Sequence, residues 1–177
     1  AGYDVAEAAP PPLEPSAAAW LDLVGHELRG LWPLLEAVGS DGARRFLADA
    51  LRAGPDAGAD GYAGALVARH AVARAWAAFQ ERHPLLLGPV STQPPFPVGR
   101  DLAGVEAVAG ILGSLQLTVT VNLVGLPSVA VPAGLGGGLP QGVQLIGPRW
   151  REDLCLDAAE AVEAALGTLG PVDPRAA

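Results

Sequence analysis

No charged residue occurs between Ala107 and Pro148, and this uncharged stretch limits what the chain can fold into. So long a segment without charge is typical of the interior sheet of a protein or of a membrane span. Within it, VAGILGSLQLTVTVNLVGL is long enough to span a membrane. Polar residues interrupt that window and prolines follow it, with no basic flank: Gln116, Thr118, Thr120 and Asn122, then Pro127 and Pro132. We therefore expect interior sheet of a larger fold and no membrane span.

Composition and net charge indicate which classes of binding partner to expect. Half of the residues are hydrophobic and 17% are charged, so the chain should fold. The net charge is -8 and every basic residue is Arg, because the sequence has no Lys. An acidic chain lacks the electrostatic footprint of a nucleic-acid or anionic-membrane binder. The lone Cys155 excludes an intramolecular disulfide and agrees with a reducing compartment, so we expect a cytoplasmic protein.

Four helices are predicted from spacing and caps. The first follows Ser16 as N-cap, and Pro33 should kink or end it. The second runs from Ser40 or Asp41 to Gly54, and the third from about Gly61 to Arg82. The last covers Glu152 to Leu166 and is closed by Gly167.

Short strands are expected at residues 3–5, 85–87, 129–131 and 143–146. The predicted class is α/β, a mixed β-sheet flanked by helices. We treat residues 1–177 as one domain or one piece of a larger domain, mainly helical over 1–82, with strands, a pocket loop and the final helix over 83–177.

The glycine run from Gly134 to Gly138 is not a phosphate-binding loop, because it lacks the Lys and the Ser or Thr that such a loop needs. We interpret it as a flexible connection between two strands.

The sequence contains no clear catalytic or metal-binding motif among its His, Cys and Ser residues. His26, His70 and His83 have no metal-ligand spacing, so neither a metal nor another cofactor is expected. Cys155 is interpreted as a buried small hydrophobe. The serines at 16, 40, 91, 114 and 128 lie in no Gly-x-Ser-x-Gly motif, so no catalytic residue is assigned.

One loop is a candidate binding element. Residues 89–97 combine polar groups with an aromatic ring and are stiffened by several prolines. Loops of this kind at strand ends often line pockets. We therefore expect Ser91, Gln93 and Phe96 to contact a substrate.

Two segments near the C-terminus carry a family resemblance. NLVGLPSVAVPAG followed by LPQGVQLIG, an aromatic residue, Glu152 and an Ala-rich helix resembles the C-terminal end of the amidase signature family. HPLLLGPVSTQPPFP is similar to the family segment that brings a loop to the pocket. Structural roles are expected of six residues in these segments: Asn122 and Gln144 as buried amides bonded to backbone, Gly125 and Gly142 at close approaches or unusual torsions, and Pro127 and Pro132 where strands meet loops.

The resemblance implies hydrolysis of a C–N amide bond by a Ser nucleophile, a second Ser and a Lys base, which the family carries in a Gly/Ser-rich N-terminal signature. This sequence has no Ser-Ser pair and no Lys. We therefore expect this chain to be the C-terminal portion of an amidase that hydrolyses a small carboxylic amide. The chain should be inactive alone, and its expected partners are the amide substrate and the N-terminal portion of the enzyme. Alternatives are a non-catalytic binding or scaffold protein and part of a glutamyl-tRNA amidotransferase-like subunit. The apolar stretch also predicts self-association, and hence a possible homo-oligomer.

Overall fold

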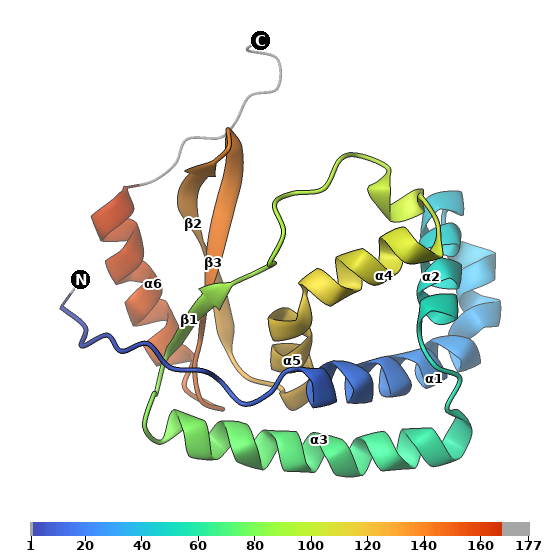
Figure 1. The fold of residues 1–177 in the computed structure, drawn as a ribbon, viewed down its shortest axis with the longest axis horizontal. Coiled ribbons are helices and arrows are strands. Elements are labelled where there is room, and N and C mark those ends of the chain that lie inside the picture. The colour runs from blue at the N-terminus through green and yellow to red at the C-terminus, as the bar shows by residue number, and fades with distance from the viewer. Residues whose placement is uncertain (1, 168–177) are drawn as a thin grey trace.

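A small antiparallel sheet stands between one helix and a group of five others in this computed structural model, which describes residues 2–167 (Figure 1). The helices are α1 (Glu14–Val38), α2 (Asp41–Ala53), α3 (Gly58–Gln80), α4 (Val105–Ser114), α5 (Gln116–Val124) and α6 (Glu152–Leu166). The strands are β1 (Leu86–Pro89), β2 (Ser128–Gly136) and β3 (Leu139–Ile146), and a 3-10 turn, η1, covers Arg100–Leu102. The α/β class predicted from the sequence is confirmed.

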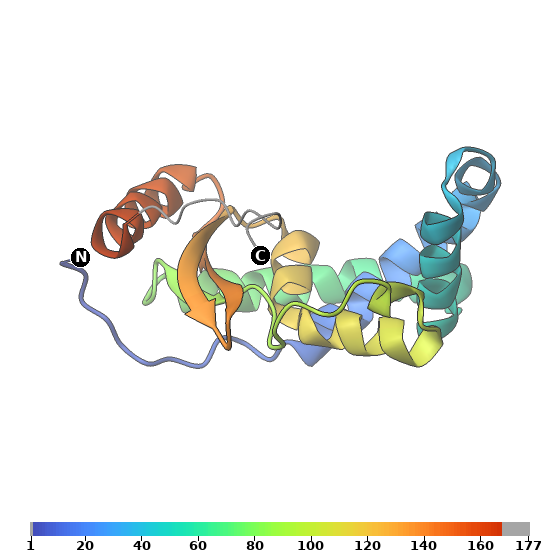
Figure 2. The ribbon, with the colours of Figure 1, turned by 90° about the horizontal axis from the view of Figure 1, so that it is seen from above.

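The sheet has the order β1-β3-β2 within the described residues. Val131 pairs with Val143 and Val129 with Leu145, so these apolar side chains share one face of the sheet. On that face Val129, Val131 and Leu145 pack with Ala158 and Ala159 of α6. On the other face, Ile146 belongs to the main core and Gly88 lies against Leu117 of α5. Figure 2 shows α6 and the α1–α2 corner at opposite ends of the molecule.

The glycine run forms a tight turn rather than a flexible loop. β2 and β3 extend further than the sequence suggested and leave only Gly137 and Gly138 between them, with φ of 59° and 82°. Those left-handed values favour Gly at both positions, which explains the run in the sequence. Pro132 lies inside β2, beside a register shift between Pro132 and Gly134, and not at the strand end where it was expected.

The expected interior sheet is wrong for the first half of the uncharged stretch, which folds as α4 and α5. In α5, residues 119, 120, 121, 123 and 124 are all buried. A helix that is apolar on most sides shows no clear helical period, so its β-branched residues resemble a strand in the sequence. Gly125, with φ of 66°, ends α5 as an unusual torsion, as expected. Asn122 is exposed and donates to Thr118 O in its own helix, so its expected burial is wrong.

Those two helices also bear on the membrane question. Within residues 2–167 no single helix is both long and apolar enough to cross a bilayer. Taken together, α4 and α5 have the length and composition to cross a bilayer, but the two helices meet at a bend of 70°.

Near the N-terminus the structure corrects two expectations and narrows a third. Residues 3–5 form no strand and are exposed. Helix α1 begins at Glu14 with a proline in its first turn, and Ser16 is a fully buried residue of the helix rather than its cap. Of the two effects expected of Pro33, a kink or the end of the helix, the second does not occur, because α1 continues to Val38. By contrast, the Ser40 cap, which accepts from Ala43 N at 3.2 Å, the Gly54 end of α2 and the bounds of α6 are confirmed.

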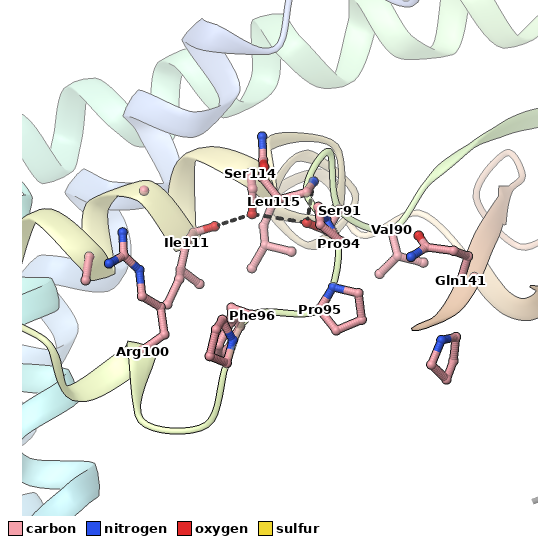
Figure 3. Close-up of a pocket in the computed structure, with 16 residues that line it drawn as sticks. Val90, Ser91, Pro94, Pro95, Phe96, Arg100, Ile111, Ser114, Leu115 and Gln141 are labelled. Atoms are coloured by element: carbon pink, nitrogen blue, oxygen red, sulfur yellow. Dashed lines mark hydrogen bonds between the residues drawn. The ribbon is translucent and has the colours of Figure 1, made fainter. Parts of the chain in front are cut away.

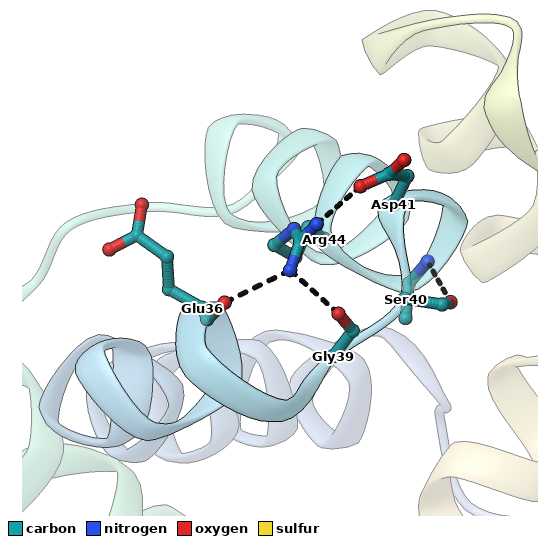
Figure 4. Close-up of polar contacts among 6 residues, drawn as sticks. Glu36, Gly39, Ser40, Asp41 and Arg44 are labelled. Atoms are coloured by element: carbon teal, nitrogen blue, oxygen red, sulfur yellow. Dashed lines mark hydrogen bonds and ion pairs between the residues drawn. The ribbon is translucent and has the colours of Figure 1, made fainter.

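Arginines from neighbouring elements satisfy the carbonyl groups at helix C-termini. Arg44 donates to Glu36 O at 3.0 Å and to Gly39 O at 2.7 Å at the end of α1, and also pairs with Asp41 (Figure 4). At the end of α2, Arg29 donates to Leu51 O at 3.1 Å. At the end of α5, Arg69 donates to Leu123 O at 2.7 Å and Arg149 donates to Val124 O at 3.0 Å. The last four carbonyls of a helix lack internal partners, and positive charge is favourable there.

Gln144 connects the strands to α5. Its side chain is 4% exposed, and Nε2 donates to Pro89 O at 2.8 Å and to Thr118 Oγ1 at 3.2 Å. Ser128 donates to its Oε1 at 3.3 Å. Thr118 in turn donates to Val90 O at 2.8 Å, so the start of the loop after β1 is held by β3 and α5 together.

The main core predicts a large difference between two tryptophans. Trp76 is fully buried among residues of α1, α3 and α5, whereas Trp150 is 86% exposed. Trp76→Ala should lower the free energy of unfolding by about 3–5 kcal/mol, because it leaves a cavity. The matched change Trp150→Ala should alter it by less than about 0.5 kcal/mol. Urea titrations followed by circular dichroism measure both, and equal midpoints would contradict this packing.

The Gln144 network predicts local as well as global effects. Gln144→Leu should destabilise the fold by about 1–3 kcal/mol, because it removes the hydrogen bonds that the buried Gln144 amide makes to Pro89 O, Thr118 Oγ1 and Ser128 Oγ. It should also speed hydrogen exchange at the Thr92 amide, which donates to Ser114 O at 2.9 Å. The control is Gln141→Leu on the same strand, since the Gln141 side chain forms no hydrogen bond within residues 2–167. Similar exchange at Thr92 in the two variants would refute this role of Gln144.

Candidate functional site

A pocket of about 610 Å³ opens between the loop after β1, helix α4 and the tip of the β2–β3 hairpin (Figure 3). The loop contributes Ser91, Gln93, Phe96 and Arg100, along with Val90 and the prolines at 94, 95 and 97. Helix α4 and the residue after it contribute Ala107, Gly110, Ile111, Ser114 and Leu115. The hairpin contributes Pro140, Gln141 and Gly142.

Hydrogen bonds fix the loop against α4. Ser91 Oγ donates to Ser114 Oγ at 3.1 Å and accepts from Gln93 N at 3.1 Å, and Ser114 Oγ donates to Ile111 O at 2.7 Å (Figure 3). With the Thr118 bond to Val90 O, these contacts hold both ends of the Val90–Gln93 segment. The pocket wall is therefore set before any ligand binds, which reduces the entropy lost on binding.

The lining is apolar, with separated polar groups. Phe96 is 52% exposed and faces the same space as Ile111 and Leu115 (Figure 3). Amide side chains enter from the loop at Gln93 and from β3 at Gln141. A mostly apolar concave surface with a few polar groups is typical of small-molecule sites.

The structure brings together all three residues expected at the site, since Ser91, Gln93 and Phe96 line one pocket. Whether they contact a substrate stays a prediction. Of the residues given structural roles, Gly142 also lines the pocket, although a Cβ there would meet Val131 O at an ordinary 3.5 Å, so no close approach requires Gly. Asn122, Gly125, Pro127, Pro132 and Gln144 lie outside the lining.

Sequence reasoning missed the α4 wall, Arg100 and Gln141. The sequence does not predict the α4 wall, because the uncharged stretch from Ala107 to Pro148 indicates interior sheet and nothing in a single sequence places residues 107–115 beside the loop. Gln141 had a signal in the sequence, because it lies in the LPQGVQLIG segment that carries the family resemblance.

The pocket contains hydroxyl groups but no activated nucleophile. Ser91 Oγ donates to Ser114 Oγ, which in turn donates to Ile111 O, and no His, Asp, Glu or Lys lines the pocket to act as a base. Cys155 is 2% exposed, and burial raises the pKa of its thiol, which keeps it protonated and inert. Within residues 2–167 no group of His, Cys, Asp and Glu could hold a metal ion.

The sequence is similar to those of known proteins from one family. Residues 38–156 match the family model described as Amidase. An indoleacetamide hydrolase of Bradyrhizobium japonicum is 41% identical over 59% of this chain and 23% of its own length. A glutamyl-tRNA(Gln) amidotransferase subunit of Streptococcus pyogenes is 48% identical over 45% of this chain and 16% of its own. The chain thus spans about a quarter or less of these relatives.

Solved structures share the fold. A crystal structure of an amidase superposes with a TM-score of 0.69 at 26% identity, covering 88% of this chain and 36% of that one. 6-Aminohexanoate cyclic dimer hydrolase in complex with its substrate gives a TM-score of 0.69 at 23% identity, covering 94% and 38%. Because the family model matches more than half of its residues, this chain belongs to the amidase family.

Proposed function

We propose that this chain is the C-terminal portion of an amidase that hydrolyses the C–N bond of a small carboxylic amide. It supplies part of the sheet and one wall of the substrate pocket, while a separate portion of the enzyme supplies the nucleophile. Such a protein would work in the cytoplasm. The observation that carries the proposal is a pocket that is pre-formed yet has no base beside its hydroxyl groups.

The lining suits a neutral amide. A carboxamide has both a donor and an acceptor, and the side chains of Gln93 and Gln141 offer both complementary groups. Phe96, Ile111 and Leu115 provide an apolar surface for the hydrocarbon part of such a molecule. Hydrolysis additionally needs a nucleophile with a base within hydrogen-bond reach, which a second portion of the enzyme must bring to this wall.

One alternative has a specific observation in its favour. The amidotransferase relative is the more identical of the two, over a shorter segment. An enzyme of that kind would transfer the nitrogen of an amide donor to the acceptor and leave the donor as its carboxylate. Measuring formation of the donor carboxylate and of free ammonia, with and without glutamyl-tRNA, therefore separates the two functions, because hydrolysis yields both and transfer yields the carboxylate without free ammonia. A non-catalytic binding or scaffold role would show ligand binding without release in either case.

An ammonia-release assay tests the proposal. The chain alone should be silent across aliphatic and aryl amides, and ammonia should appear when it is mixed with an amidase N-terminal portion that carries the Ser-Ser-Lys signature. Activity from the chain alone would show a nucleophile that the sequence and pocket do not provide. Silence of the mixture as well as of the chain would contradict the amidase role.

In the active mixture, Phe96→Ala should lower kcat/KM for aryl amides by about 5- to 10-fold, and for short aliphatic amides less, because an aromatic contact is removed. Val98→Ala is the matched control, since Val98 is fully exposed on the same loop and does not line the pocket. Equal effects of the two changes on aryl amides would show that Phe96 does not contact the substrate.

A further inference from the structure

Most arginines in the described part of the chain already have partners. Seven of them cap helix ends, bond to a loop carbonyl or pair with a carboxylate: Arg29, Arg44, Arg45, Arg52, Arg69, Arg149 and Arg151. The Arg100 side chain takes part in none of the hydrogen bonds or ion pairs found within residues 2–167. It is also the one charged side chain in the lining of the pocket.

The backbone holds Arg100 at this position. Arg100 N donates to Pro97 O at 3.0 Å and Leu102 N donates to Gly99 O at 3.0 Å, which forms η1. Arg45 on α2 donates to Leu102 O at 3.3 Å, which connects this turn to α2. A guanidinium that starts from a fixed turn loses less conformational freedom on binding than one on a loose loop.

The charge of Arg100 is not cancelled inside the pocket. Asp101 and Glu106 are its nearest acids along the sequence, and neither forms an ion pair with it in the described residues or lines the pocket. The chain as a whole carries a net charge of -8, so a cation here is a local feature and not part of a basic surface. In Figure 3, Arg100 lies beside Ile111 at one end of the pocket and Gln141 lies at the other.

We propose that Arg100 determines specificity, so that the pocket prefers amides that carry a carboxylate at the end remote from the amide group. The guanidinium fork matches the two oxygens of a carboxylate, and the apolar lining between Arg100 and Gln141 accommodates a hydrocarbon spacer. This inference rests on the proposed function, because it names the substrate class of the same pocket.

The test compares two probes that differ only in charge at the remote end. Adipamate has a carboxamide at one end and a carboxylate at the other, and hexanamide has the same carboxamide on a neutral chain of equal length. Dissociation constants for the full 177-residue chain are measured by ligand-observed saturation-transfer NMR. The variants are Arg100→Gln, which removes the charge, and Arg100→Lys, which keeps it. Arg74→Gln is the control, since Arg74 is exposed on α3 outside the pocket.

Adipamate should bind more tightly than hexanamide. Arg100→Gln should weaken adipamate binding by about 3- to 10-fold and leave hexanamide unchanged, because a partly exposed ion pair contributes modestly. Arg100→Lys should restore part of the loss, Arg74→Gln should change neither constant, and added salt should weaken adipamate binding alone.

Two results would overturn the inference, and they differ in what they say of the pocket. If hexanamide binds but Arg100→Gln leaves adipamate binding unchanged, the role of Arg100 is refuted while the amide pocket stands. If neither probe binds the chain, both the inference and the proposed pocket fall.

Discussion

The buried amide of Gln144 is the contact on which the rest of this structure depends. It joins the end of β1, the hydroxyl of Thr118 on α5 and the hydroxyl of Ser128 on β2. A buried amide is tolerated only when its hydrogen bonds are made, so these elements must keep one relative position. Thr118 passes the constraint on to Val90 O, and the Ser91–Ser114 bond extends it to α4. The shape of the pocket therefore follows from side chains that lie behind it.

Arginine has a structural role throughout this lysine-free chain. Its planar fork reaches carbonyl groups at the C-terminal ends of α1, α2 and α5, which have no basic residue of their own to satisfy them, apart from Arg52 in α2. Against that pattern, an arginine in the pocket lining that bonds to no carbonyl or carboxylate is available to bind a ligand. Arg100 stands beside an apolar pocket instead of at a helix end, which is why we assign it to ligand selection and not to the fold.

Sequence reasoning predicted the elements whose signals are local. Ser40 and Gly54 predict the ends of α2, and Gly167 predicts the end of α6. It failed where burial overrides propensity, because α5 is buried on most sides and its Val and Thr residues imitate a strand. The loop bearing Ser91, Gln93 and Phe96 was found from its prolines, yet the opposing α4 wall and Arg100 were not, because only the tertiary fold brings residues 100–115 against that loop.

The pocket between the loop, α4 and the hairpin is where we expect an amide to bind, and the proposed function depends on that binding. A residue-resolved NMR map of the chain titrated with hexanamide tests this directly. Perturbed amide resonances should cluster at residues 90–97, 110–115 and 140–142, with α6 and the α1–α2 corner unchanged. Perturbations centred on α6 or on the α1–α2 corner, or none at all at saturating hexanamide, would contradict it.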